Sequence, residues 1–402
     1  MQPALGLAVL LRHKLSGADL APLYQALIQK ATADPREAGA LLDAAVILQF
    51  SGNAELALKL QQEALRVTRH YGLPVREPVR LRLLALMAPG GLMANVPIEC
   101  LLEDSDIQLD IVYVTGEETD STRLPDHDVL FVAVGESEAN RSILATWARL
   151  LADWRGPVIN RPERIMAVAR DTAAGLLHGR PGIEMPRTWA LSREAVAAIA
   201  TQLKLPEDMD FPCILRPRDS HAGHDLCKLD TQHALAERLE SMPGNDFYLS
   251  RFVDYRSTDG LFRKYRIVLI AGRPFACHMG ISSRWMIHYL NADMEGNPAN
   301  RAEEARFMET FDEAFAIRHQ DALSTIHHTM GLDYLGIDCA ETQDGRLLVF
   351  EVDPAMVVHA MDPSDLYPYK EATMQKVFAA FRAMLMTCAL RHQGGEAERR
   401  DE

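Results

Sequence analysis

Three carboxylates near the C-terminal end of the chain stand where they could share a cation. Glu351 and Asp353 are two positions apart in the apolar stretch "LVFEVDP", so in a strand their side chains face the same side. Asp338 lies in the preceding stretch "YLGIDCAE", and the turn "QDGR" between the two predicts an antiparallel pair. Carboxylates among apolar residues are costly unless a cation joins them, and Mg²⁺ takes such oxygen ligands together with substrate phosphates. The alternative is that each carboxylate faces water from a half-exposed strand.

Basic residues elsewhere could supply the cations that a phosphate ligand needs. Arg216 ends the apolar run "CIL", Arg266 lies in "KYRIVLI", and Arg284 lies in "SSRWMIHY". Taken singly, each arginine also suits a surface ion pair. His278 and His288 crowd the segment around Arg284, but a metal site made by the two histidines is less favoured because no third soft ligand is evident.

The stretch "FPCILRPRDSHAGHDL" at 211–226 has the pattern of a strand followed by a small polar loop. Gly223 gives the loop the backbone freedom to turn its N–H groups toward an oxyanion. Ser220, Ala222 and Gly223 offer little side-chain packing, so we expect the loop to be mobile without nucleotide and ordered with it. A plain surface hairpin is the alternative.

The elements that must position these residues begin with a helical segment. Residues 1–75 show an unbroken helical periodicity, so we expect this segment to be entirely helical and to carry no catalytic group. Ala44, Leu48, Ala57 and Ala64 occur at spacings that resemble one tetratricopeptide-type hairpin, in which small residues let two helices approach closely. An ordinary helical domain is the alternative.

Beyond this segment the pattern changes to strands. Residues 76–163 alternate short β-branched runs with helix-like segments, which predicts a small parallel α/β domain. Residues 164–390 contain longer strand runs joined by turns such as "AGRP" and "TQDGR", which predicts an α+β domain whose hairpins carry side chains to one place. The tail at 391–402 is expected to be disordered.

Composition narrows the classes of function. The chain has 402 residues and a net charge of -14, which argues against general attraction to nucleic acid or to an anionic membrane. Its six cysteines contain no CxxC pair, and neither a secretory signal nor an apolar run of spanning length is evident, so a cytoplasmic protein is expected. The nucleotide fingerprints GxGxxG and GxxxxGK[ST] are both missing.

The order of the motifs resembles that of the ATP-grasp superfamily, nearest to its RimK/glutathione-synthetase branch. The matching blocks are "PCILRP" with "SHAGH", "KYRIVLIAGRP" and "GIDCAETQDGRLLVFEVDP", and the resemblance covers about residues 80–390. It implies an ATP-grasp fold preceded by the small α/β domain and the helical segment. It also implies that ATP lies between two α+β subdomains, and that such a ligase phosphorylates a carboxylate before an amine attacks the acyl phosphate.

The resemblance implies roles for particular residues of this chain. Nucleotide contacts are implied for the strand end, the loop and the hinge strand, namely Arg216, Ser220, His221, Gly223, Arg251, Phe252 and Val253. Mg²⁺ ligation is implied for Asp338, Glu351 and Asp353. Catalytic roles near the transferred phosphate are implied for Arg266, Arg284 and His288.

Four positions depart from the family pattern. Arg216 and Thr172 stand where lysines are usual, Asp353 where an asparagine is usual, and Arg251 where a glutamate is common. Arg216 keeps the charge, and Asp353 remains a good oxygen ligand. Thr172 cannot replace a cation, so nearby Arg170 is the candidate substitute.

Together these patterns predict an ATP- and Mg²⁺-dependent carboxylate–amine ligase that acts on a small molecule or peptide. Two alternatives stay open: a phosphotransferase on the same fold, and a catalytically degenerate protein that acts as a binding module. A protein partner for the N-terminal helices and a homo-oligomer also stay open. No nucleic-acid or membrane partner is expected.

Overall fold

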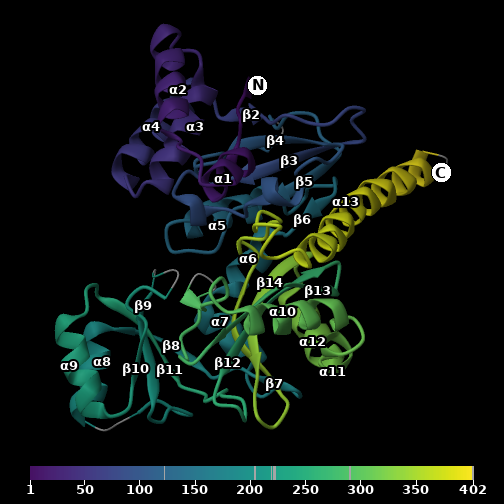
Figure 1. Ribbon diagram of the computed structural model, residues 1–402. Coiled ribbons are helices and arrows are strands. Elements are labelled where there is room, and N and C mark those ends of the chain that lie inside the picture. Colours follow the sequence, from purple (N-terminus) through teal and green to yellow (C-terminus); the bar gives the residue numbers. More distant parts are fainter. Residues whose placement is uncertain (122, 203–204, 219, 221–222, 289–290, 401–402) are drawn as a thin grey trace.

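The computed structural model describes the chain except residues 122, 203–204, 219, 221–222, 289–290 and 401–402. Its strands form three sheets, of six, four and five strands, and helices pack against them (Figure 1). The mixed α/β and α+β class predicted from the sequence is confirmed.

Four helices precede the first long strand. They are α1 (Leu7–Leu15), α2 (Ala21–Ala33), α3 (Ala38–Phe50) and α4 (Ala54–Val67). Ala44, Ala57 and Ala64 are fully buried, because α3 and α4 pack against one another through small residues. The tetratricopeptide-like interpretation of this hairpin stays a prediction.

The prediction that residues 1–75 are entirely helical is wrong. β1 (Gln2–Pro3) and β2 (His70–Gly72) pair in parallel with one another, and β2 also pairs with β4 (Ile107–Tyr113). Strands of two or three residues are too short to show a two-residue period, so the periodicity of the helices between them concealed both.

The six-stranded sheet has the order β1-β2-β4-β3-β5-β6. Its remaining strands are β3 (Leu81–Met87), β5 (Val129–Val132) and β6 (Val158–Ile159). β3 pairs in parallel with β4 and β5, and β5 pairs in parallel with β6, which confirms the predicted small parallel layer. β3 and β5 are nearly continuous apolar runs because both faces of the sheet are covered there, one of them by α5 (Arg141–Leu150).

The four-stranded sheet is antiparallel and has the order β10-β9-β11-β8. Its strands are β8 (Thr188–Ser192), β9 (Cys213–Pro217), β10 (Cys227–Leu229) and β11 (Asp246–Arg251). Its apolar face packs on α8 (Arg193–Gln202) and α9 (Gln232–Ser241), which leaves the other face for the interior of the molecule (Figure 1).

The five-stranded sheet has the order β13-β12-β14-β15-β7, antiparallel except for the β15–β7 pair. Its strands are β7 (Ile183–Glu184), β12 (Phe262–Ile270), β13 (Arg273–Ser282), β14 (Tyr334–Glu341) and β15 (Leu347–Asp353). The helices beside it include α7 (Arg170–Leu177), α10 (Pro298–Thr310) and α12 (Gln320–Met330).

Helix α13 (Lys370–Arg400) connects two of the sheets. The ring of Phe381 lies 6.0 Å from that of Phe131 in β5 and 5.4 Å from that of Tyr334 in β14. One side chain of this helix therefore belongs to the core of the six-stranded and of the five-stranded sheet. The last turns of α13 also correct a prediction, because residues 391–400 are helical where disorder was expected.

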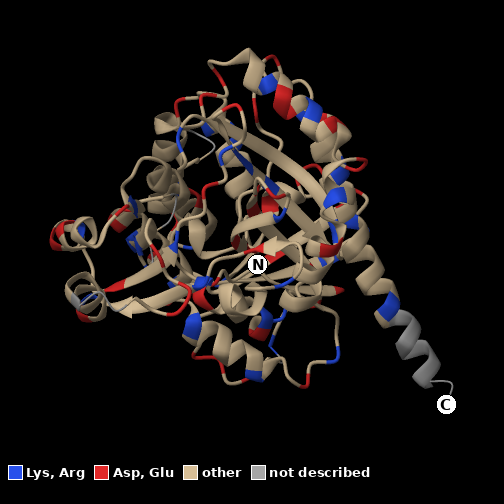
Figure 2. Cartoon of the chain, turned by 90° about the horizontal axis from the view of Figure 1, so that it is seen from below, with Lys and Arg blue, Asp and Glu red and all other residues tan. Residues whose placement is uncertain are grey.

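The exterior of the molecule carries charges of both signs. Figure 2 shows Lys and Arg lying beside Asp and Glu over most of the chain. Within the described ranges, no helix combines the length and the apolar character that crossing a bilayer requires.

Candidate active site

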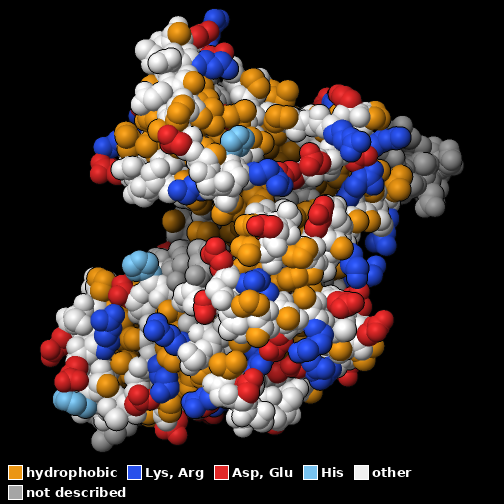
Figure 3. Space-filling view, viewed as in Figure 1, with side chains coloured by type: hydrophobic (Ala, Val, Ile, Leu, Met, Phe, Trp, Pro, Cys, Tyr) orange, Lys and Arg blue, Asp and Glu red, His pale blue; other side chains and the backbone are white. Residues whose placement is uncertain are grey.

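A cavity of about 1240 Å³ lies where the three sheets meet. Its walls include Glu136 from the loop after β5, Arg216 from β9 and Glu351 from β15. Figure 3 shows the molecule hollowed between its upper and lower parts, with hydrophobic side chains inside the hollow. The volume exceeds the ~300–1,000 Å³ of a typical small-ligand pocket, so a nucleotide and a second substrate can fit together.

The three predicted carboxylates all line this cavity. β14 and β15 are antiparallel, as predicted, and Asp338 stands opposite Glu351 while Gly336 stands opposite Asp353. Asp338 also stands opposite Arg266 on the other neighbouring strand, β12. The register therefore places two carboxylates and an arginine in one row across the sheet.

Asp338 is enclosed by cations from β12. It is 1 % exposed, and its two oxygens accept hydrogen bonds from Arg266 Nε at 2.8 Å and Arg266 Nη2 at 3.0 Å. Lys264 Nζ lies 2.6 Å from Oδ2. Burial alone would raise the pKa of Asp338, but the charges of Arg266 and Lys264 outweigh it and hold that pKa well below its usual range. Asp338 is therefore ionised at neutral pH.

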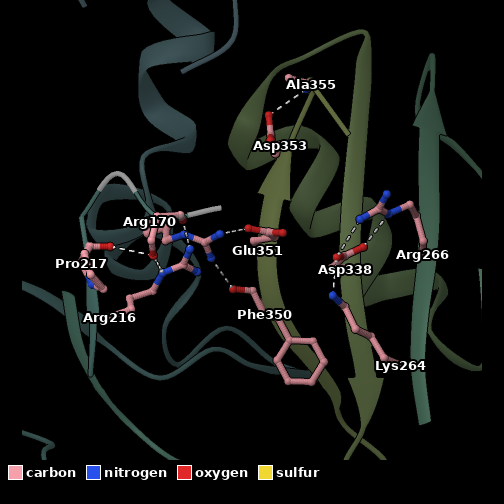
Figure 4. A network of polar contacts seen from close by, with 11 residues as sticks. Arg170, Arg216, Pro217, Lys264, Arg266, Asp338, Phe350, Glu351, Asp353 and Ala355 are labelled. Carbon is pink, nitrogen blue, oxygen red and sulfur yellow. Dashed lines mark hydrogen bonds and ion pairs between the residues drawn. The ribbon is translucent and has the colours of Figure 1, made fainter. Parts of the chain in front are cut away.

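Glu351 is paired with an arginine from a different element. Arg170, the first residue of α7, donates from Nη2 to Glu351 Oε2 and from Nη1 to the carbonyl oxygen of Phe350 at 3.5 Å (Figure 4). Burial lowers the pKa of Arg170, although the nearby charge of Asp353 opposes this. Asp353 accepts a hydrogen bond from the backbone N–H of Ala355 at 2.7 Å.

Arg216 points into the cavity from the end of β9 and forms no ion pair with a carboxylate of the described residues. It donates to the carbonyl oxygen of Ser220, and its Nε lies 3.3 Å from Ser220 Oγ. Burial and, after it, the charge of Arg170 together lower the pKa of Arg216 to about 9. Two guanidinium groups thus repel one another across this part of the cavity (Figure 4).

The predicted phosphate loop follows Arg216. Ser220 and Gly223 line the cavity, and Gly223 has a φ of 74°. A Cβ at Gly223 would lie 3.1 Å from Met286 Sδ, so this backbone passes close to the opposite wall. The prediction for His221 lies outside the described residues.

The predicted hinge residues also line the cavity. Arg251 donates from Nη2 to Glu184 Oε1 at 2.8 Å, so its side chain is held against β7. The backbone N–H of Phe252 donates to the carbonyl oxygen of Pro212 at 2.9 Å. Val253 follows at the cavity wall.

The two remaining catalytic predictions separate in the structure. His288 lines the large cavity, and burial, followed by the charges of Lys264 and Arg266, lowers its pKa, so it is neutral at pH 7. Arg284 is exposed and lines a neighbouring pocket instead. The structure does not bring Arg284 to the carboxylates, because the chain turns its side chain outward just after β13.

Mg²⁺, which the family resemblance implies, fits only part of the predicted ligand set. In the described part of the chain, no three His, Cys, Asp or Glu side chains lie close enough together to hold a metal. Asp338 is engaged by Arg266 and Lys264 on both oxygens. Glu351 and Asp353 remain suitable, because Mg²⁺ often uses one or two carboxylates and completes its shell with phosphates and water.

Lys264, Glu136 and Arg218 are among the charged residues of the cavity that sequence reasoning missed. Lys264 lies two positions before Arg266 on the same strand face, a signal that the two-residue period could have revealed. Glu136 follows the carboxyl end of a parallel strand, where ligand-binding residues commonly lie. Arg218 forms an ion pair with Glu138 at 3.2 Å across the cavity, and the sequence gives no sign of this contact.

Comparisons with known proteins complete the description. No family model matches the chain. It is similar to a RimK domain ATP-grasp protein from Sphaerobacter thermophilus (20% identity, 76% of this chain and 99% of the other, TM-score 0.42). It is also similar to D-alanine–D-alanine ligase from Bacillus anthracis complexed with ATP (13% identity, 79% and 100%, TM-score 0.47). A third similar structure is the ATP-grasp ligase PsnB with a precursor variant, Mg and ADP (12% identity, 76% and 99%, TM-score 0.41). Two of these three descriptions name ATP-grasp, the family that the sequence resembles.

Proposed function

We propose that this protein is an ATP-dependent ligase that activates a carboxylate as an acyl phosphate and joins it to an amine. The observation that carries the proposal is the meeting of Arg170 and Arg216 in one cavity, where their charges repel and the pKa of Arg216 is lowered to about 9. An anion bound between them relieves this repulsion. A triphosphate supplies such an anion, and Arg binds phosphate oxygens through two N–H groups at once.

The carboxylates opposite the arginines would hold the metal that accompanies ATP. Glu351 and Asp353 are the residues that we assign to Mg²⁺, which would offset the negative charge of the phosphates when bound. Asp338 has a different role in this proposal: it positions Lys264 and Arg266 at the cavity wall through the contacts described above.

The proposed reaction has two steps, and this chain's residues act in both. First a carboxylate oxygen of the substrate attacks the γ-phosphorus, and ADP leaves. Arg216 and Arg266 stabilise the negative charge around the phosphoryl group in that step. The amine nitrogen then attacks the acyl carbon, and phosphate leaves. His288 is neutral at pH 7 and can accept the proton that the amine loses.

Nucleotide binding to an Arg216→Gln variant tests the proposal. The variant should bind ATP·Mg²⁺ at least about tenfold more weakly in calorimetric titration, because a charge-assisted hydrogen bond is worth roughly 1.5–3 kcal/mol. Arg238→Gln is the matched control, since Arg238 lies on the same sheet's helix α9 and pairs with Asp225 at 3.1 Å. Unchanged affinity in Arg216→Gln contradicts the assignment, and binding without turnover by any amine favours the binding-module alternative.

A further inference from the structure

We propose that the cavity takes, beside the nucleotide, a monocarboxylic acid with an extended apolar body. This inference rests on the proposed function, because the acid is the group that would be activated. The part of the cavity that would hold the apolar body is called here the apolar chamber. We assign to it six apolar residues from the lining of the cavity, namely Leu11, Leu15, Met93, Met286, Met356 and Met361.

One wall of the apolar chamber continues from the active site into the N-terminal helices. Met361 packs in a buried cluster with Ala8 and Cys100, and Leu11 of α1 lies against the same cluster. Leu15 and Met93 line the cavity and are nevertheless 43 % and 42 % exposed. Large apolar side chains that remain exposed inside a cavity mark a surface that an apolar ligand can cover.

Two other residues of the apolar chamber, Met286 and Met356, have flexible side chains. Met286 approaches Gly223 of the phosphate loop, where a Cβ would lie 3.1 Å from its sulfur. Met356 lies over β14, where a Cβ at Gly336 would be 2.7 Å from its sulfur. Methionine adapts its shape at low cost, so these walls suit an extended apolar group better than a small, fixed one.

The charged end of the cavity selects the head group. Lys264 lines the cavity and its ammonium group has three N–H donors, of which the 2.6 Å contact with Asp338 Oδ2 uses one. Arg266 also donates from Nη1 to the carbonyl oxygen of Val357 at 3.1 Å. The same arginine thus touches the segment between Met356 and Met361, so a carboxylate held there would extend its apolar body along the methionines.

A polar amino acid fits this arrangement less well. Its second charged group would face the methionines and lose its contacts with water, which is costly without a partner. The proposed ligand therefore has a single acidic group on an apolar body.

Calorimetric titration of the full chain with ATP analogue and Mg²⁺ present tests the ligand class with defined probes. Decanoate should bind at least tenfold more tightly than hexanoate, because each buried methylene contributes up to about fourfold in affinity. It should also bind at least tenfold more tightly than succinate, which has two charges and a short body. Equal affinity for the three acids overturns the proposal.

A pair of leucine variants tests the place of binding. Leu15→Glu should weaken decanoate binding about tenfold or more, because it puts a negative charge at the mouth of the apolar chamber. Leu58→Glu is the matched control: Leu58 lies on α4, is 44 % exposed and does not line the cavity, so its variant should bind decanoate normally. Equal effects of the two variants overturn the assignment of the apolar chamber.

The same titrations separate this inference from the proposed function. Binding of the ATP analogue is measured first in each sample, before any acid is added. Decanoate binding without nucleotide binding overturns the ligase proposal and keeps the ligand class. Nucleotide binding without decanoate preference leaves the ligase proposal intact and overturns the ligand class.

Discussion

The charged residues of the five-stranded and four-stranded sheets, which line the cavity from two sides, differ in their partners. On the five-stranded sheet, Asp338 is matched with Arg266 and Lys264 through the strand register before any ligand arrives. On the four-stranded sheet, the hydrogen bonds described for Arg216 go to Ser220 alone, and its pKa is lowered. The cations of the first wall are held by a carboxylate, whereas the hydrogen bonds described for Arg216 go to neutral oxygens. In the proposed function, the first wall is the structural framework and Arg216 is the group that gains most from a bound anion.

The largest expected effect on stability comes from removing the carboxylate of Asp338 on the five-stranded sheet. Asp338→Asn leaves Arg266 and Lys264 without their carboxylate in a partly buried site, so it should lower the free energy of unfolding by ~3–5 kcal/mol. Urea unfolding at pH 7 measures this. The pKa of Asp338 is lower in the folded chain, so its stabilisation is present above the unfolded value and is lost as the pH falls below about 4. A variant that is as stable as the parent at pH 7 would contradict the framework role.

Glu351 pairs with Arg170 of α7 and lines the cavity, where we assign it to the metal that accompanies ATP. Glu351→Gln should reduce ATP-dependent turnover by about 10²–10³-fold while the protein stays folded, since the shape is kept and the charge is lost. ADP release and thermal unfolding are followed on the same sample. Glu303→Gln is the control, as Glu303 pairs with Arg263 at 2.5 Å and does not line the cavity. Near-normal turnover in folded Glu351→Gln would remove Glu351 from the phosphate site.

Glu136 lines the cavity from the loop after β5, in the part of the molecule that contains the six-stranded sheet. Burial raises its pKa from 4.5 to about 6, although Arg141 opposes this. Because the folded-state pKa is above the unfolded one, ionising Glu136 costs stability as the pH rises from about 4.5 through 6. Glu136→Gln should therefore raise stability at pH 8 relative to pH 4 by about 1–2 kcal/mol, compared with the parent chain. Identical pH profiles of unfolding would show that Glu136 is not perturbed.

The smallest effect on stability is expected for the ion pair between Arg218 and Glu138, which connects two sides of the cavity. Arg218 and Glu138 pair at 3.2 Å with side chains 26 % and 46 % exposed. Arg218→Gln should cost ~0.2–1 kcal/mol of stability, and the difference from the parent should shrink as salt is added. Denaturant midpoints at low and high ionic strength measure it. A loss above about 2 kcal/mol would mean that this contact is part of the framework.

Sequence reasoning worked where the signal is local. The turn between Glu341 and Leu347 and the two-residue spacing of Glu351 and Asp353 predicted the β14–β15 pair correctly. It failed for β1 and β2, whose partners lie far along the chain and whose lengths show no period. It also placed three carboxylates on a metal without foreseeing their cationic partners. Arg170 reaches Glu351 across 181 positions, and no spacing rule reports such a contact.

Helix α13 has a consequence for how the chain acquires its structure during synthesis. Phe381 completes the apolar surroundings of Phe131, a residue of a strand made long before it. At ~5–20 residues per second, synthesis of the residues between Phe131 and Phe381 takes on the order of tens of seconds. During that time this apolar face of the six-stranded sheet is uncovered. The nascent chain is therefore exposed to aggregation during this time, until α13 has been made and covers that face.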